Sequence, residues 1–215
     1  MSSHFPVRSC GPNALLIDCG QEFVTAVSTV LMKSAKFVDV IPAEQSVMVM
    51  SNSAVDANEV LTLIESSTEK HTGSVGRDIE LPMTYDGADL AEAAQLCHVS
   101  THELIALHSE VTYQAIFAGF APGFIYCTGL PEKLQLPRRA IPRIAVPAGS
   151  VAMADIYTAV YPLESPGGWH LLGTTDVVMF DPNRHPESFL SPGDRVRFVA
   201  TNTQRSGTSP KGSKK

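Results

Sequence analysis

The texture of the chain changes at Tyr113-Gln-Ala-Ile-Phe-Ala-Gly-Phe-Ala-Pro-Gly-Phe-Ile-Tyr126, where an apolar, β-rich run ends in a turn of glycine, proline and aromatic residues. Ten of the 15 prolines and eight of the 15 glycines lie between residues 113 and 200. Six β-rich runs lie between these turn residues: Tyr113–Ala118, Ile144–Val146, Tyr157–Tyr161, Trp169–Leu172, Val177–Phe180 and Arg195–Val199. Short strands between regular turn signals predict a closed or nearly closed β-barrel.

Upstream of that stretch, strand-like and helical patterns alternate. Strand-like runs lie at 14–19, 37–41, 46–50 and 78–83, and apolar residues recur at helical spacing over 22–35. A second helix begins after Asp56, an N-cap residue that is followed three positions later by Glu59. The resulting β-α-β-β-α-β order predicts a ferredoxin-like split unit, a scaffold with no intrinsic chemistry.

Residues 86–110 predict a pair of helices, the second opened by a capping box from Ser100 to Glu103. That second helix carries two glutamates and no Lys or Arg, which excludes a DNA-reading helix-turn-helix. We therefore expect an α+β protein: a ferredoxin-like domain over 1–80 and a β-barrel domain over 81–202 that includes the helical pair. Residues 203–215 lack apolar anchors and predict a disordered tail.

Composition excludes several classes of protein. The 215 residues include 16 Lys plus Arg and 22 Asp plus Glu, a net charge of −6, which argues against a nucleic-acid partner. No apolar run reaches the ~18 residues of a membrane span. The first residues show no signal-peptide core, so we expect a cytoplasmic protein. Cys10, Cys19, Cys97 and Cys127 form no metal or disulfide pattern, and we expect no metal site and no reactive thiol, with Cys127 the alternative for the latter.

Arg138, Arg139 and Arg143 lie within six residues of one another in an otherwise acidic protein. Arginine binds carboxylate or phosphate bidentately, and the prolines around these residues stiffen their loop, so the cluster predicts an anion site. The alternative is a surface loop whose arginines pair with the protein's own acids. No P-loop or dinucleotide-binding fingerprint occurs, so a nucleotide is not bound through either motif.

A second candidate site is Glu164-Ser-Pro-Gly-Gly-Trp-His170. Gly167 and Gly168 permit close approach of a ligand, and Trp169, the only tryptophan, offers a stacking face. Glu164 and His170 flank this face as candidate acid–base groups. The alternative is a tight turn whose tryptophan fills the barrel. The stretch that ends at Tyr126 either walls a pocket or closes the barrel.

Four motifs together carry a resemblance to a known family. They are Gly119-Phe-Ala-Pro-Gly-Phe-Ile-Tyr126, Pro137-Arg-Arg with Pro142-Arg and Val146-Pro-Ala-Gly-Ser150, Tyr161-Pro-Leu-Glu-Ser-Pro-Gly-Gly-Trp169, and Phe180-Asp-Pro with Pro192-Gly-Asp-Arg-Val-Arg-Phe198. Over residues 80–200 the chain resembles the allophanate hydrolase subunit 1 family, whose members include the B subunit of bacterial 5-oxoprolinase and the kinase inhibitor KipI. The likeness is weaker over residues 10–65.

The resemblance implies a ferredoxin-like N-terminal domain, a cyclophilin-like barrel and two kinds of partner, a C subunit (allophanate hydrolase subunit 2) and an A subunit. Together such subunits open the lactam of 5-oxoproline to glutamate with hydrolysis of ATP, which we expect to act with Mg as a co-substrate. The chain by itself is then an incomplete enzyme with no tightly bound cofactor.

Within that chemistry, Arg138, Arg139 and Arg143 are expected to neutralise phosphate or the substrate carboxylate, and His170 or Glu164 is expected to act as a base. Tyr126, Gly167, Gly168 and Trp169 are expected to contact the substrate. Two other roles stay open: inhibition of a sensor histidine kinase, as KipI does, and a biotin-dependent carboxyltransferase component, since the same paired domains resemble part of urea carboxylase.

Overall fold

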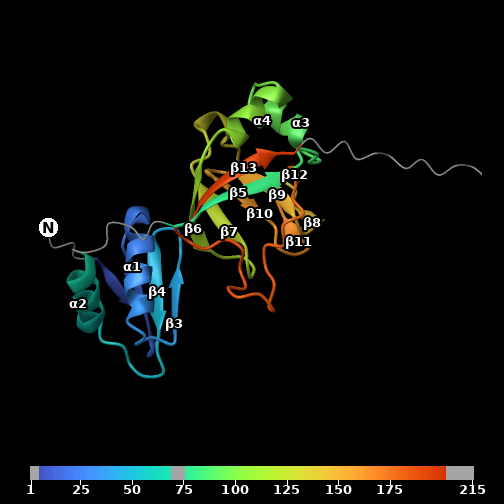
Figure 1. Cartoon of the computed structure of the whole chain (residues 1–215). Coiled ribbons are helices and arrows are strands. Elements are labelled where there is room, and N and C mark those ends of the chain that lie inside the picture. Colours follow the sequence, from blue (N-terminus) through green and yellow to red (C-terminus); the bar gives the residue numbers. More distant parts are fainter. Residues whose placement is uncertain (1–4, 69–75, 202–215) are drawn as a thin grey trace, which may run out of the picture.

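The computed structural model describes residues 5–68 and 76–201, which form two parts (Figure 1). The N-terminal part contains β1 (Val7–Ser9), β2 (Ala14–Asp18), α1 (Gln21–Lys33), β3 (Asp39–Pro42), β4 (Ser46–Met50) and α2 (Ala57–Thr68). The barrel part contains β5 (Asp78–Met83), α3 (Leu90–Leu96), α4 (Thr101–Ser109), β6 (Tyr113–Ala118), β7 (Ile125–Thr128), η1 (Glu132–Leu134), β8 (Arg143–Val146), β9 (Ser150–Ala154), β10 (Tyr157–Val160), β11 (Ser165–Gly167), β12 (His170–Thr174) and β13 (Arg195–Ala200). The expected tail, 203–215, lies outside the described residues. The mixed helix-and-sheet class is confirmed.

The N-terminal part is a sheet of order β1-β2-β4-β3 with α1 and α2 beside it. Because side chains alternate between the two faces of a strand, Ile17, Val47 and Val49 all point to the same face of the sheet. There they form one buried cluster with the apolar side of α1. The carboxylate of Asp56 accepts a hydrogen bond from the Asn58 amide at 2.9 Å, so the predicted cap of α2 is confirmed.

The strand β5 was expected to complete this first sheet, and that expectation is wrong. It pairs in parallel with β13, from Asp78 opposite Arg195 to Met83 opposite Ala200. Two features explain the difference. The edge beside β2 is taken by β1, and the inward side chains of β5, Leu81 and Met83, belong to the buried core of the barrel.

The barrel part is one sheet of order β12-β9-β10-β7-β6-β13-β5. Its two edges meet at a bridge where Thr84 and Thr174 exchange backbone hydrogen bonds of 2.8 Å, so the barrel is nearly closed, as predicted. The run 177–180 forms a single bridge, between Phe180 and Ser188, instead of the expected strand. The strands β8 and β11 form a separate two-stranded ribbon on the outside of this sheet.

The helices α3 and α4 follow β5, as the sequence predicts, and the Ser100 hydroxyl accepts from the Glu103 amide at 3.1 Å. The turn before α3 lies directly against β12, because a Cβ on Gly87 would stand 2.3 Å from the Leu171 carbonyl oxygen. This close approach fixes the start of α3 beside the strand that carries His170.

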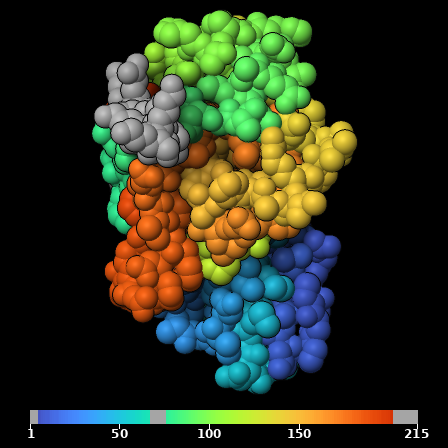
Figure 2. All heavy atoms as spheres, turned by 90° about the vertical axis from the view of Figure 1, so that its right-hand side faces the viewer, coloured from blue at the N-terminus to red at the C-terminus, as the bar shows by residue number. Residues whose placement is uncertain are grey.

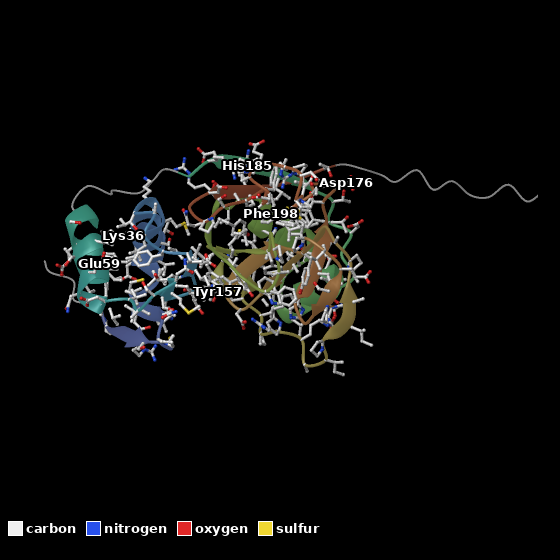
Figure 3. The ribbon with its side chains drawn as sticks, turned by 90° about the horizontal axis from the view of Figure 1, so that it is seen from below. Lys36, Glu59, Tyr157, Asp176, His185 and Phe198 are labelled. Carbon is white, nitrogen blue, oxygen red and sulfur yellow. The ribbon has the colours of Figure 1, made fainter. Side chains whose placement is uncertain are left out.

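The two parts meet along one side of the barrel. Glu44, in the turn between β3 and β4, lies beside the phenol of Tyr157 on β10 and contributes to raising the pKa of that phenol, after the larger effect of burial. Figure 3 shows Tyr157 on the side of the barrel that faces the N-terminal part. Among the described residues, no helix has the length and apolar character needed to cross a membrane.

Cys127 lies on β7, in the interior of the barrel, with 1% of its surface exposed. Burial raises the pKa of this thiol to about 12, with a smaller contribution from the charge of Asp194. Thiolate is the reactive form, so at neutral pH this side chain is an unreactive core residue.

Candidate functional site

Arg138 and Arg139 lie on the loop between η1 and β8, and Arg143 is the first residue of β8. Arg139 and Arg143 pair with acids near the start of α3. Arg139 Nη1 donates to Asp89 Oδ1 at 2.9 Å and to Glu92 Oε2 at 2.5 Å. Arg143 Nη2 donates to the same Asp89 oxygen at 2.5 Å. Two positive charges therefore face two negative ones, and this cluster is close to neutral as a whole.

Arg138 is differently placed. Its Nε lies 3.6 Å from Asp155 Oδ2, and 60% of its side chain is exposed, so water screens this long pair. Its charge reaches two phenols: burial raises the pKa of Tyr126 and of Tyr161, and the positive charge of Arg138 opposes both rises, as a weaker effect. Arg138 thus brings positive charge to a wall of aromatic side chains.

Two cavities share Arg138. The larger, of about 430 Å³, is lined by Glu92, Leu96, Leu136, Pro137, Arg138, Arg139, Ala140, Ile141 and His170. The smaller, of about 60 Å³, is lined by Phe120, Phe124, Tyr126, Arg138, Tyr161, Pro166, Gly167, Gly168 and Trp169. In Figure 2 the gold surface of the middle of the chain, to which the arginine loop belongs, lies between the green helices and the blue N-terminal part. The sequence from 166 to 170 supplies both cavities, with His170 on the larger one.

The small cavity is an aromatic box. Trp169, 4% exposed, meets Phe124 and Tyr126 edge-on with ring centroids 5.6 Å apart. Tyr161 lies 5.3 Å from Phe124, and Phe120 closes the outer side at 5.2 Å from the same ring. Rings in this edge-to-face arrangement hold one another rigidly and offer their faces to a flat, apolar ligand.

The two glycines of the box differ. A Cβ on Gly167 would lie 2.2 Å from the Tyr161 hydroxyl, whereas a Cβ on Gly168 would make ordinary contacts of 3.6 Å or more. Only Gly167 therefore needs to lack a side chain. Because it has none, the phenol of Tyr161 packs directly against the backbone of Gly167.

His170, on β12, is 4% exposed and uses only one of its ring nitrogens. Its Nε2 lies 3.0 Å from the Pro137 carbonyl oxygen, while Nδ1 is buried and has no hydrogen-bond partner among the described residues. A carbonyl oxygen only accepts, so a neutral His170 carries its proton on Nε2 and keeps the lone pair of Nδ1 free. This assignment makes Nδ1 a basic atom without a partner.

The structure brings most of the predicted site residues together. Arg138, Arg139, Tyr126, Gly167, Gly168, Trp169 and His170 line one or both cavities. Arg143 lies behind them, held by Asp89. Glu164 is exposed in the turn before β11 and lines neither cavity, so it is not brought together with His170.

Sequence reasoning missed Asp89 and Glu92, the acids that neutralise the loop, and Phe120, Phe124 and Tyr161, which complete the box. Phe120 and Phe124 lie in the motif Gly119–Tyr126, and Tyr161 begins the motif Tyr161–Trp169. The aromatic residues of these two motifs were therefore an available signal. Asp89 offered only the weak signal of an acidic residue just before a predicted helix.

Comparison with known proteins places these motifs in a family. A family model described as "Carboxyltransferase domain, subdomain C and D" matches residues 5–190. The curated 5-oxoprolinase B subunit of Escherichia coli O157:H7 is 52% identical over 126 residues, which span 57% of this chain but only 58% of that protein. The protein of the same name from Bacillus subtilis (strain 168) is 31% identical over 229 aligned positions, covering 93% of this chain and 94% of that one.

Solved structures agree with that assignment. The crystal structure of TTHA0988 matches with a TM-score of 0.80 and 32% identity, over 89% of this chain and 40% of that chain, so this chain spans less than half of it. The Kluyveromyces lactis urea carboxylase matches with a TM-score of 0.64 and 15% identity, over 92% of this chain and 22% of that chain, a likeness that shows the fold alone. The chain, matched over residues 5–190 and similar over nearly its whole length to a curated 5-oxoprolinase B subunit, belongs to the family of carboxyltransferase C and D subdomains.

Proposed function

We propose that this chain is the component of an ATP-dependent 5-oxoprolinase that contacts the lactam, acting with the A and C subunits of such an enzyme. The observation that carries the proposal is the aromatic box with Arg138, whose pair with Asp155 is long and exposed, at its wall. His170 lines the adjoining cavity, and its buried Nδ1 has no hydrogen-bond partner among the described residues. The names of the curated relatives support the same assignment.

The box suits the ring of 5-oxoproline. A five-membered lactam is flat and compact, and its apolar faces match the rings of Tyr126 and Trp169. The single carboxylate of this substrate matches the single open charge of Arg138, which a guanidinium binds through two parallel hydrogen bonds. The carbonyl end of the lactam then lies toward the cavity that His170 lines.

His170 is the base in this proposal. The lactam is a poor electrophile, so ATP first phosphorylates its oxygen and is converted to ADP. Water then adds to the carbon, and the carbon–nitrogen bond breaks as the nitrogen takes up a proton. A second water hydrolyses the resulting acyl phosphate to the carboxylate and free phosphate. Nε2–H stays bound to the Pro137 carbonyl, so Nδ1 is the ring nitrogen left to accept the proton of the attacking water. Nδ1 is buried in the chain alone, and the proposal requires that docking of the partner subunits opens a path for water to it. Glu164, outside both cavities, is left without a part in this step.

The triphosphate of ATP, with its Mg, is placed by this proposal on a partner protein. Arg139 and Arg143 are already neutralised by Asp89 and Glu92, and only Arg138 is left to face an anion. One open charge matches a carboxylate better than a chain of phosphates, which proteins bind with several cations or a metal.

The C subunit is proposed to dock on an apolar rim of four exposed side chains: Phe120 and Ile141, which line the cavities, and Ile144 and Leu163, which lie on or just before the ribbon strands β8 and β11. Ile144, on the ribbon strand β8, is 93% exposed and Ile141 is 81% exposed, so both apolar side chains lie almost wholly in solvent. The longer chain of TTHA0988, of which this chain matches 40%, has further sequence that can supply such a cover.

Co-purification tests this rim. Ile144→Asp is expected to abolish co-purification with the C subunit, whereas Val38→Asp, equally apolar and 63% exposed on the N-terminal part, leaves it intact. Equal retention of both variants contradicts this surface.

Binding of the lactam to the chain alone tests the box. Arg138→Ala is expected to weaken binding of 5-oxoproline about tenfold, because the variant loses a two-bond carboxylate pair that water partly screens at this exposed site. The same variant leaves 2-pyrrolidone, the ring without a carboxylate, unaffected. Arg8→Ala, which removes an exposed arginine of the N-terminal part, is the matched control.

Turnover in the reconstituted complex tests the activity. Phosphate release that depends on both ATP and 5-oxoproline is expected only when the A and C subunits are present. Unchanged turnover by Arg138→Ala in that complex contradicts the proposal, and activity of the chain alone contradicts the division of labour.

The description of the family favours one second candidate, a component of a biotin-dependent carboxyltransferase. In that case carboxyl transfer appears when a biotin carboxylase and a biotinylated carrier are added, and 5-oxoproline causes no release of phosphate. The two assays separate the candidates, because each requires a co-substrate that the other does not use.

A further inference from the structure

Asp89 is the most heavily bonded carboxylate near the site, and the proposed chemistry does not use it. It lies just before α3 with 2% of its surface exposed. Its Oδ1 accepts from Arg139 and Arg143, and its Oδ2 accepts from the Leu171 amide at 2.8 Å. A buried carboxylate with three donors is fully satisfied and fixed in place.

These bonds join the two segments that meet at His170. Leu171 follows His170 on β12. Arg139 follows Pro137 on the loop, and Arg143 begins β8 where that loop ends. The segments touch directly at two points, where His170 Nε2 meets the Pro137 carbonyl at 3.0 Å and the Arg139 amide donates to the Gly168 carbonyl at 2.7 Å. Asp89 ties both segments together from behind.

The main chain of Asp89 is itself anchored to β12. Its amide donates to the Leu171 carbonyl at 3.1 Å, so the two residues exchange a pair of hydrogen bonds through the Asp89 carboxylate and amide. Gly87 donates to the Leu172 carbonyl at 3.1 Å, one step further along the strand. The carboxylate therefore reaches the arginine loop from a rigid base.

We infer that Asp89 is a positioning residue that holds the Pro137 carbonyl against His170 and so keeps the ring proton on Nε2. A free loop would let the carbonyl move away, and water or another acceptor would then compete for either ring nitrogen. With Asp89 in place, the lone pair of Nδ1 stays directed away from the loop, as a base requires. The inference rests on the proposed function only where it calls His170 a base.

The tautomer of His170 tests the inference without any substrate. The nitrogen resonances of the imidazole in the folded chain report which ring nitrogen is protonated, and His170→Gln identifies the signal by its loss. Wild-type protein is expected to show the Nε2–H form. Asp89→Asn is expected to lower the ratio of the Nε2–H to the Nδ1–H form about fivefold, the value of one neutral hydrogen bond.

Glu92→Gln is the matched control. It removes the same charge from the same arginine, Arg139, but Glu92 is half-exposed and has no bond to β12 in the described structure. The control is expected to keep the wild-type tautomer ratio. A ratio that is unchanged in Asp89→Asn, or changed equally in Glu92→Gln, overturns the inference and leaves the base role of His170 standing. A wild-type ring protonated on Nδ1 overturns the base role as well.

A second variant covers the case in which Asp89→Asn does not fold. Arg143→Gln removes one of the three donors without leaving an acid unpaired, because Arg139 and the Leu171 amide remain. It is expected to shift the tautomer ratio in the same direction, about twofold. If Arg143→Gln folds and its tautomer ratio equals that of the wild type, Asp89 is not the positioning residue.

Discussion

Two buried histidines, His108 on α4 and His170 on β12, lie in the barrel part under different conditions. His108 is 0% exposed and uses both ring nitrogens: Nδ1 lies 2.7 Å from the Tyr85 hydroxyl and Nε2 lies 3.0 Å from the Thr158 hydroxyl. Thr158 donates its own proton to the Ala152 carbonyl at 3.1 Å, so it accepts from Nε2–H, and Tyr85 donates to Nδ1. Phe198, labelled in Figure 3, packs on this ring with the centroids 4.8 Å apart.

His170 has the same protonated nitrogen, Nε2, but its Nδ1 has no partner among the described residues. A buried polar group is normally satisfied, because leaving it unpaired costs free energy. The difference teaches how to separate two roles: the fully bonded ring of His108 serves the fold, and the half-bonded ring of His170 has capacity left for a ligand or a proton.

Replacement of each histidine by leucine tests most directly whether the two rings contribute differently to stability. His108→Leu is expected to lower the free energy of unfolding by about 3 kcal/mol, because the Tyr85 and Thr158 hydroxyls lose their buried partner. His170→Leu is expected to cost about 1 kcal/mol, the value of its single bond to Pro137. Urea denaturation of both variants measures these losses, and equal losses would show that the two rings do not differ in role.

The stability that His108 contributes is expected to depend on pH. Burial lowers the pKa of His108 from its ordinary 6.5 to about 3, so the unfolded chain binds a proton at a higher pH than the folded chain does. The stability due to the neutral ring is therefore complete above pH 6.5 and is lost as the pH falls toward 3. Between pH 6.5 and 5 the expected loss is about 2 kcal/mol. Urea titrations at several pH values measure it, and His108→Gln should lack this part of the slope; a slope that persists in the variant assigns the effect to other groups.

The smallest expected change in stability concerns Gly167 and Gly168, the two glycines that precede Trp169 and His170. Gly167→Ala is expected to cost about 1.5 kcal/mol, because its methyl group would push on the buried Tyr161 hydroxyl, 2.2 Å away. Gly168→Ala should cost under about 0.5 kcal/mol. Thermal unfolding compares the two, and a loss in Gly168→Ala as large as that in Gly167→Ala would show that the box is not shaped by Tyr161.

Local patterns were the part of the fold that could be predicted from the sequence. The Ser100 cap and the strand Tyr113–Ala118 were predicted with their observed bounds, since both depend on neighbouring residues. The strand Asp78–Met83 was recognised but given to the wrong sheet. Its partner, β13, stands 117 residues away, and a parallel pairing at that distance leaves no local signal in the sequence.

The candidate site divides in the same way. Its unusual residue types, the arginines, the paired glycines and Trp169, were visible in the sequence. The interpretation that the arginines pair with the protein's own acids describes Arg139 and Arg143, whereas Arg138 makes only a long, exposed pair with Asp155, and its part in an anion site stays a prediction. Which arginine pairs with an acid depends on Asp89, which lies 50 residues from Arg139 in the sequence. Only the folded chain brings these two residues together.

The pairing of β5 with β13 also bears on synthesis. In the sheet, β5 has β13 as its one neighbour, and β13 separates it from β6. A ribosome therefore releases β5 long before its partner exists, while β1 to β4 can already form their own sheet. The barrel closes only once residues 195–200 have emerged, so the first part is expected to fold during translation and the second at its end.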